Sequence, residues 1–335
     1  MRNKRIIYCG IVPSIVILFL CNLFYGSVSI PIPAVTDILF GKEIEPVAWK
    51  IIVLQSRLPQ AITALLAGSA LAVSGLMLQT LFRNPLAGPG ILGISDGANL
   101  GVAMVMLWTG VSVRIGVSAV IAAFTGASAV LALILYFSTK VRNNVLVLII
   151  GIMIGYLASS GISILNALAP SESIRSYVLW GLGSFSNVSY LQIPFYSIAV
   201  LIGLLGAILL IKPLNIILLG ENYATNLGIH VKRTRIFIMV ITGFLTAIVT
   251  AFCGPVGFIG LAVPHIARMV LRTSNQQFLL PATILSGAAV ALLCNLLTTI
   301  PLGKTLLPLN AITPLLGAPV ILYVILNRKN LHYFN

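Results

Sequence analysis

The sequence is dominated by apolar runs that are long enough to cross a lipid bilayer. A helix needs about 20 apolar residues to span the hydrocarbon core. We place about ten such runs at 6–25, 59–80, 92–108, 115–137, 144–167, 191–211, 234–253, 260–272, 279–299 and 309–327. The run at 260–272 is short, so we expect a tilted or partial span there. Because lipid offers no hydrogen-bond partners to the backbone, this pattern predicts an all-α membrane protein.

The composition also indicates a protein that is surrounded by lipid. Of the 335 residues, 59% are hydrophobic and only 8% are charged, whereas a soluble domain carries about 25% charge. The first run resembles a secretion signal, but residues 6–25 are long enough to span and no A-x-A-like cleavage site follows. We therefore expect this run to be retained as the first helix.

The basic residues divide unequally between the loops on the two sides. If the N-terminus lies inside and the spans alternate, 14 of the 20 Lys and Arg residues fall inside and 6 fall outside. Positive charge favours the cytoplasmic side, so both termini are expected in the cytoplasm. The net charge of +14 is then a signal of topology, and nucleic acid is not an expected partner.

The sequence lacks the residues that would supply energy or catalysis within the membrane. Asp96 is the only acidic residue expected inside a span, whereas an ion-coupled carrier normally needs several such groups. No G-x-x-x-x-G-K-[ST] and no H-E-x-x-H pattern occurs. Cys9, Cys21, Cys253 and Cys294 form no CxxC or Cys/His cluster. We expect no enzyme activity, no metal site and no cofactor bound by this chain.

Small residues recur at helical spacing in the fifth run. Gly151, Gly155 and Ser159 are four residues apart, and Ser160 and Ser163 follow. Such spacing allows close approach of helices in lipid. The same pattern also suits a polar strip that faces a transport path, and the sequence leaves both interpretations open.

Two short glycine motifs have similar sequences. GPGILG begins at Gly88 and GPVGFIG begins at Gly254, each between two apolar runs. The expected topology puts the first inside and the second outside, as in inverted repeats.

Four segments together resemble one family of transporters. Between Arg57 and Gly101 the chain contains R-L-P, G-S-x-L-A-x-S-G, Q-x-x-x-R-N-P-L-A-x-P and L-G-x-S-x-G-A. LLGENYATNLG follows from Leu218, GPVGFIGLAVPHIAR from Gly254 and LLGAPVILYVIL from Leu315. The combination is similar to the FecCD-type permeases, which are membrane subunits of bacterial ABC importers for iron–siderophore chelates, haem and cobalamin.

The resemblance implies a fold, a function and a set of partners. It implies an inverted-repeat importer permease of the cobalamin-importer (type II) kind, with residues 1–335 as one transmembrane domain in the bacterial inner membrane. A second copy, two cytoplasmic ATPase subunits that hold ATP and Mg, and a soluble or lipid-anchored binding protein would complete the importer. An iron–siderophore chelate is the expected cargo. Cobalamin or haem is the alternative, and an ATP-independent carrier or channel is a more distant one.

The resemblance also assigns roles to residues. The coupling segment at 213–232 would contact the ATPase through Gly220, Glu221, Ala224, Leu227 and Gly228. The remaining assignments fall at the two ends of the path and along it. Arg57 would dock the binding protein, and Asn84 and Leu86, with Asn143 and Asn144, would form a gate at the inner end. Two further roles come from position in the sequence and not from the resemblance. Lys304, in an outside loop, would assist docking, and the polar strip of Ser159, Ser160 and Ser163 would line the path.

Some positions depart from the family pattern. Asn295 and Thr299 stand where the family often has Asp and Arg, and Asp96 stands where it often has a small hydroxyl residue. Residues 275–277 replace a D-H-R motif. We therefore expect the outer surface near the last loop to be built differently here.

The topology can be tested by labelling from outside. Cysteines introduced as Arg2→Cys or Asn335→Cys should escape a membrane-impermeant maleimide in intact spheroplasts and react after permeabilisation. Lys42→Cys, in an expected outside loop, should react in both states. Labelling of either terminus in intact spheroplasts would contradict the topology.

Overall fold

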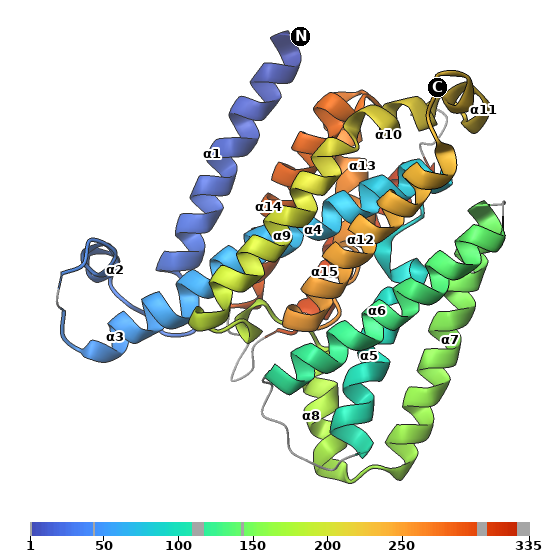
Figure 1. Ribbon diagram of the computed structural model, residues 1–335. Coiled ribbons are helices and arrows are strands. Elements are labelled where there is room, and N and C mark those ends of the chain that lie inside the picture. The colour runs from blue at the N-terminus through green and yellow to red at the C-terminus, as the bar shows by residue number, and fades with distance from the viewer. Residues whose placement is uncertain (1, 43, 109–116, 142–143, 300–306, 327–335) are drawn as a thin grey trace.

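The protein is a bundle of helices, seen in a computed structural model (Figure 1). The structure describes residues 2–42, 44–108, 117–141, 144–299 and 307–326, and these contain helices and turns but no strand. The predicted all-α membrane fold is therefore confirmed. Asn143 and Lys304, which were given roles from the sequence, lie outside the described residues.

Ten apolar helices correspond to the ten predicted spans. Among the described residues, six helices are long and apolar enough to cross a membrane, and four shorter apolar helices accompany them. They are α1 (Arg2–Phe24), α4 (Leu58–Phe82), α5 (Ile94–Ala103), α6 (Val117–Lys140), α7 (Asn144–Leu168), α9 (Ile193–Leu209), α12 (Val231–Cys253), α13 (Ile259–Leu271), α14 (Gln276–Thr298) and α15 (Leu309–Leu326). A π-helical turn, η3 (Met104–Trp108), continues α5.

Shorter helices lie between the spans. They are α2 (Ile32–Leu39), α8 (Ser171–Gly181), α10 (Ile211–Leu218) and α11 (Glu221–Asn226), with single turns η2 (Pro89–Leu92), η4 (Phe185–Asn187) and η5 (Tyr190–Gln192). A further short helix, α3 (Val47–Ile51), is continuous with the second span. We call the end of the bundle that carries α10 and α11, where α1 begins, the coupling end (Figure 1). The opposite end is called the distal end.

The second span is longer than the sequence predicted. A helix was expected to begin near Pro59, after a loop that ended at Arg57, but α3, a π-helical turn η1 (Ile52–Arg57) and α4 run on as one helix of 36 residues from Val47 to Phe82. The polar residues Lys50, Gln55 and Arg57 gave its first part the appearance of a loop. Arg57 therefore lies within a helix.

The central helix α4 is held by glycine contacts with two neighbours. A Cβ atom on Gly75 would lie 1.6 Å from the carbonyl oxygen of Gly260 in α13, and one on Gly68 would lie 2.2 Å from that of Gly287 in α14. The most apolar part of the span Val47–Phe82 is 89% buried. Close backbone approach of this kind is how helices associate in lipid, where no hydrophobic force drives them together.

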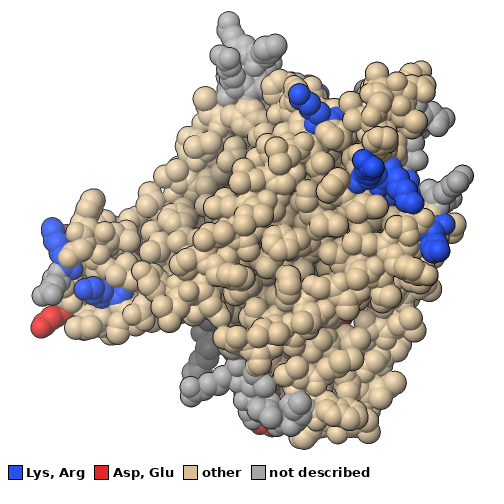
Figure 2. All heavy atoms as spheres, in the orientation of Figure 1, with Lys and Arg blue, Asp and Glu red and all other residues tan. Residues whose placement is uncertain are grey.

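On the face shown in Figure 2, the exposed charged side chains gather mostly at the two ends of the bundle. Figure 2 shows Lys and Arg over the coupling end near α10 and α12, and a smaller mixed group of basic and acidic residues near α2 and α3. The mixed group includes the ion pair between Lys42 Nζ and Asp37 Oδ1 at 2.7 Å. This distribution suits a bilayer across the middle of the bundle. Which end of the bundle faces the cytoplasm stays a prediction.

The glycine contact of α4 leads to a stability prediction. Gly75→Ala should separate α4 from α13, because a methyl group cannot occupy the place of the Gly260 carbonyl, and overpacking of this kind costs about 1–3 kcal/mol. The melting temperature of the purified protein in detergent should fall. The matched control is Gly10→Ala in α1, where a Cβ meets nothing within 4 Å and Ala favours the helix by up to about 1 kcal/mol. Equal effects of the two changes would contradict this packing.

Candidate functional site

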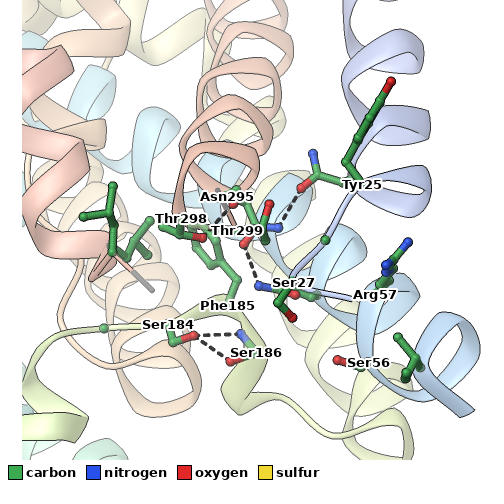
Figure 3. Close-up of a pocket in the computed structure, with 17 residues that line it drawn as sticks. Tyr25, Ser27, Ser56, Arg57, Ser184, Phe185, Ser186, Asn295, Thr298 and Thr299 are labelled. Carbon is green, nitrogen blue, oxygen red and sulfur yellow. Dashed lines mark hydrogen bonds between the residues drawn. The ribbon is translucent and has the colours of Figure 1, made fainter. Parts of the chain in front are cut away.

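A polar cavity of ≈260 Å³ opens at the distal end, and we call it the distal pocket. Its walls come from the end of α1, the start of α4, the end of α14 and η4 (Figure 3). The polar residues of its lining are mostly amides and hydroxyls, with one cation; they are Asn22, Tyr25, Ser27, Ser56, Arg57, Gln60, Ser184, Ser186, Asn295, Thr298 and Thr299.

Three amide side chains tie three helices together at this pocket. Asn295 donates from Nδ2 to Asn22 Oδ1 at 2.7 Å and accepts at Oδ1 from Gln60 Nε2 at 2.9 Å. Asn22 in turn donates to the Leu292 carbonyl at 3.0 Å. An amide can donate and accept at once, so Asn295 joins α1 to α4 without a charge. This neutral network occupies the place where the family pattern often has an aspartate.

Arg57 lines the distal pocket but is almost fully buried, with 5% of its surface exposed. Its Nη1 donates to the carbonyls of Leu23 at 2.8 Å and Phe24 at 2.9 Å, and its Nη2 donates to the carbonyl of Val28. The last carbonyls of a helix have no partner within that helix. Arg57 thus fastens the end of α1 and the loop after it to the central helix. Its predicted docking role stays a prediction.

The turn after α4 is rigid and lies at the coupling end. Asn84 Oδ1 accepts from the Leu86 backbone N–H at 2.9 Å, a local bond by which asparagine stabilises a turn. His265 Nε2 lies 2.7 Å from the Pro85 carbonyl oxygen. His265 is fully buried, so α13 holds the turn from behind while Leu86 is 42% exposed.

The two glycine motifs meet in a second cavity of ≈430 Å³, which we call the glycine-motif pocket. Its lining is mostly apolar or backbone, with three polar side chains: Ser95, Asp96 and Asn99. A Cβ on Gly155, midway along α7, would lie 2.6 Å from Asp96 Oδ2, so the carboxylate is at mid-height of the bundle. Burial, with a smaller effect of the Asp96 charge, raises the pKa of Tyr177 in α8 to about 12.

The small residues of helix α7 divide between packing inside the chain and an exposed surface. Gly151 and Gly155 face inward, because a Cβ on Gly151 would lie 2.9 Å from Leu92 Cα. Ser159, Ser160 and Ser163 are exposed. The hydroxyls of the last two bond to carbonyls one turn back, at 2.9 and 3.0 Å. The glycines therefore pack within the chain, while the serines lie on a surface that this chain leaves open. Asn144 is the first residue of α7.

The predicted coupling segment forms two short helices joined by a glycine. Gly220, with φ 121°, links α10 to α11, and Gly228, with φ 80°, follows the end of α11. A glycine in this conformation directly after a helix is a common way for a helix to end. Ala224 is buried, whereas Leu227 is 60% exposed. Glu221 begins α11.

Buried polar ties near the coupling end were not predicted from the sequence. Gln79 accepts from Arg268 Nη1 at 2.7 Å and donates to the Leu261 carbonyl at 3.1 Å. Gln276 donates to Thr80 Oγ1 at 3.1 Å. These contacts join α4 to α13 and α14. The sequence feature that could have indicated these contacts is the position of Gln79 at the start of the Q-x-x-x-R-N-P motif.

A bundle of ten apolar helices, with a polar pocket at one end and an exposed glycine-jointed segment at the other, defines the membrane subunit of a transporter. No group of three His, Cys, Asp or Glu residues in the described part of the chain could hold a metal. The FecCD transport family matches residues 14–327, and the chain belongs to this family. It is a permease of an ABC importer.

Individual relatives agree with this assignment. The chain is 35% identical over 276 residues to the vitamin B12 import system permease protein BtuC of Klebsiella pneumoniae, covering 82% of each chain. It is 34% identical over 284 residues to the hemin transport system permease protein HmuU of Yersinia pestis, covering 82% of this chain and 83% of that one. A metal-chelate type ABC transporter in an inward-facing conformation superposes with a TM-score of 0.84 at 31% identity, covering 96% and 99% of the two chains.

The amide network predicts a change in stability. Asn295→Leu should lower the free energy of unfolding by about 1–3 kcal/mol, because it leaves the buried Asn22 side chain without its partner, while the half-buried Gln60 can turn to the pocket. Thr299→Val is the control, because among the described residues the Thr299 hydroxyl bonds to the Leu296 carbonyl of the same helix, at 2.7 Å. Thermal unfolding in detergent measures both. The network would be refuted if Asn295→Leu were no more harmful than the control.

Proposed function

We propose that this permease works as a homodimer with two cytoplasmic ATPase subunits and imports cargo from an external binding protein. The observation that carries this is the segment from α10 to Gly228. It projects at the coupling end, carries the exposed side chains of Tyr223 and Leu227, and surrounds the buried Ala224. An exposed apolar patch on a short, well-formed helix suits a protein partner. The energy must come from that partner, because the chain has no nucleotide-binding motif.

The proposed cargo is an iron–siderophore chelate, with cobalamin or haem as the alternative. Support comes from the relatives, whose names cover a metal-chelate transporter, a vitamin B12 permease and a hemin permease. The glycine-motif pocket, mostly apolar with a few polar side chains, suits contact with part of the cargo.

The proposed transport path runs between two copies of the chain. The open face of α7 presents Ser159, Ser160 and Ser163 beside exposed apolar residues such as Tyr156 and Leu157. The hydroxyls of Ser160 and Ser163 bond to carbonyls of their own helix, and a second copy over this face would enclose the three serines around a path. The gate would be Asn84 and Leu86 in the turn after α4, with Asn144 at the start of α7; Asn143, proposed for the same gate, lies outside the described residues.

The distal end would face the binding protein. The distal pocket collects hydroxyl and amide groups from four elements, which suits a polar contact surface. Arg57 stabilises this surface through its bonds to the Leu23 and Phe24 carbonyls. The docking role proposed for Arg57 with Lys304 would be additional to this structural role.

The ATPase contact is tested by a change that leaves the backbone unstrained. Gly228 has φ 80°, a conformation that other residues adopt at a cost, so its neighbour Leu227 is the better choice. Leu227→Arg should reduce co-purification of the ATPase by roughly tenfold or more, because burying an unpaired charge at an interface costs several kcal/mol. Phe40→Arg, at an 85% exposed position in the distal half, is the matched control. Normal assembly and ATP hydrolysis with Leu227→Arg would overturn the assignment of this segment.

A further inference from the structure

One arginine side chain joins the end of α4 to the end of α10. Arg83 Nη2 donates to the Leu218 carbonyl at 2.6 Å and to the Ile217 carbonyl at 3.3 Å. The last carbonyls of a helix lack partners within that helix, and they attract positive charge. Arg83 therefore caps α10 from a position 134 residues earlier in the chain.

The backbone of Arg83 belongs to the turn that we propose as the gate. It follows α4 in the left-handed conformation, with φ 46°. The next residue, Asn84, donates its backbone N–H to the Gln79 carbonyl at 3.2 Å and accepts from the Leu86 N–H. The main chain of Arg83 is thus fixed in the turn, while its side chain reaches the coupling segment.

The carbonyls that Arg83 holds lie directly before the joint of the coupling segment. Gly220 has φ 121°, and its N–H donates to the Ile217 carbonyl at 3.0 Å, the same oxygen that Arg83 contacts. A Cβ on Gly220 would lie 3.5 Å from Arg83 Nη2. The joint and the arginine share a carbonyl, and the guanidinium lies against Gly220, so a displacement of α11 that shifts Gly220 and the end of α10 would act on Arg83.

We propose that Arg83 is a positioning residue that transmits displacement of α11 to the turn Arg83–Pro89, so that Leu86 moves when the ATPase moves. This inference rests on the proposed function, since it takes the segment α10–α11 as the ATPase contact. An arginine suits this role because its planar guanidinium can hold two carbonyl oxygens in a fixed geometry, whereas a lysine offers a single point of charge.

The test uses the permease–ATPase complex in proteoliposomes with its binding protein. Arg83→Met removes the donors while keeping an extended side chain. The matched control is Arg272→Met, because Arg272 also ends a helix in the left-handed conformation (φ 49°) and has an exposed side chain. ATP hydrolysis and cargo uptake are measured on the same vesicles. A fluorophore on Leu86→Cys reports the turn, with Cys9 and Cys21 replaced by Ser; Cys253 and Cys294 are buried.

Arg83→Met should assemble with the ATPase and hydrolyse ATP within about twofold of wild type. Uptake per ATP should fall by about tenfold, within the 5–150-fold range of typical coupling between sites. The fluorophore at position 86 should lose its response to ATP. The control Arg272→Met should keep both the uptake per ATP and the response. Arg83→Lys should fall between wild type and Arg83→Met, because an ammonium can keep the charge but not the two-point geometry.

The proposal is overturned if Arg83→Met retains the wild-type uptake per ATP and the wild-type fluorescence response. If Arg83→Met does not assemble, Arg83→Lys decides: wild-type uptake per ATP overturns the proposal and a reduced value supports it. A wild-type complex that neither hydrolyses ATP nor takes up cargo would count against the proposed function and not against Arg83.

Discussion

In a bilayer the backbone finds no hydrogen-bond partner outside the protein, and helices gain nothing from burying apolar surface against one another. The fold therefore depends on close backbone contact around the central helix. Gly68 and Gly75 bring α4 against Gly287 and Gly260, and the other elements are arranged around this group. Hydrogen bonds of buried amides such as Asn295 need particular partners, so they help to fix which helices pack together.

The long helix from Val47 to Phe82 also connects the two ends of the molecule through two arginines. Arg57, near its start, holds the last carbonyls of α1, and Arg83, just beyond its end, holds the last carbonyls of α10. Each guanidinium donates to backbone carbonyls at a helix end, whose dipoles favour a positive charge. The surface that would meet a binding protein and the segment that would meet an ATPase are thus both attached to one helix.

The sequence predicted the spans well because an apolar run of about 20 residues has few other structures available. It missed the part of the central helix before Pro59, since Lys50 and Arg57 are typical of a loop, and it missed the short helix α8. The turn at Asn84 and the helix before Gly228 were predictable from local chemistry. The bonds of Arg57, Arg83 and His265 were not, because their partners are backbone carbonyls, which carry no signal in a sequence.

The central claim is that this chain supplies the path and a partner supplies the energy. The most direct measurement is cargo accumulation in sealed proteoliposomes that contain the permease, its ATPase and the external binding protein, with ATP enclosed on the ATPase side. The account predicts accumulation above the external concentration that stops when the ATPase carries an inactivated nucleotide site. Equal accumulation without ATP, or by the permease alone, would contradict it.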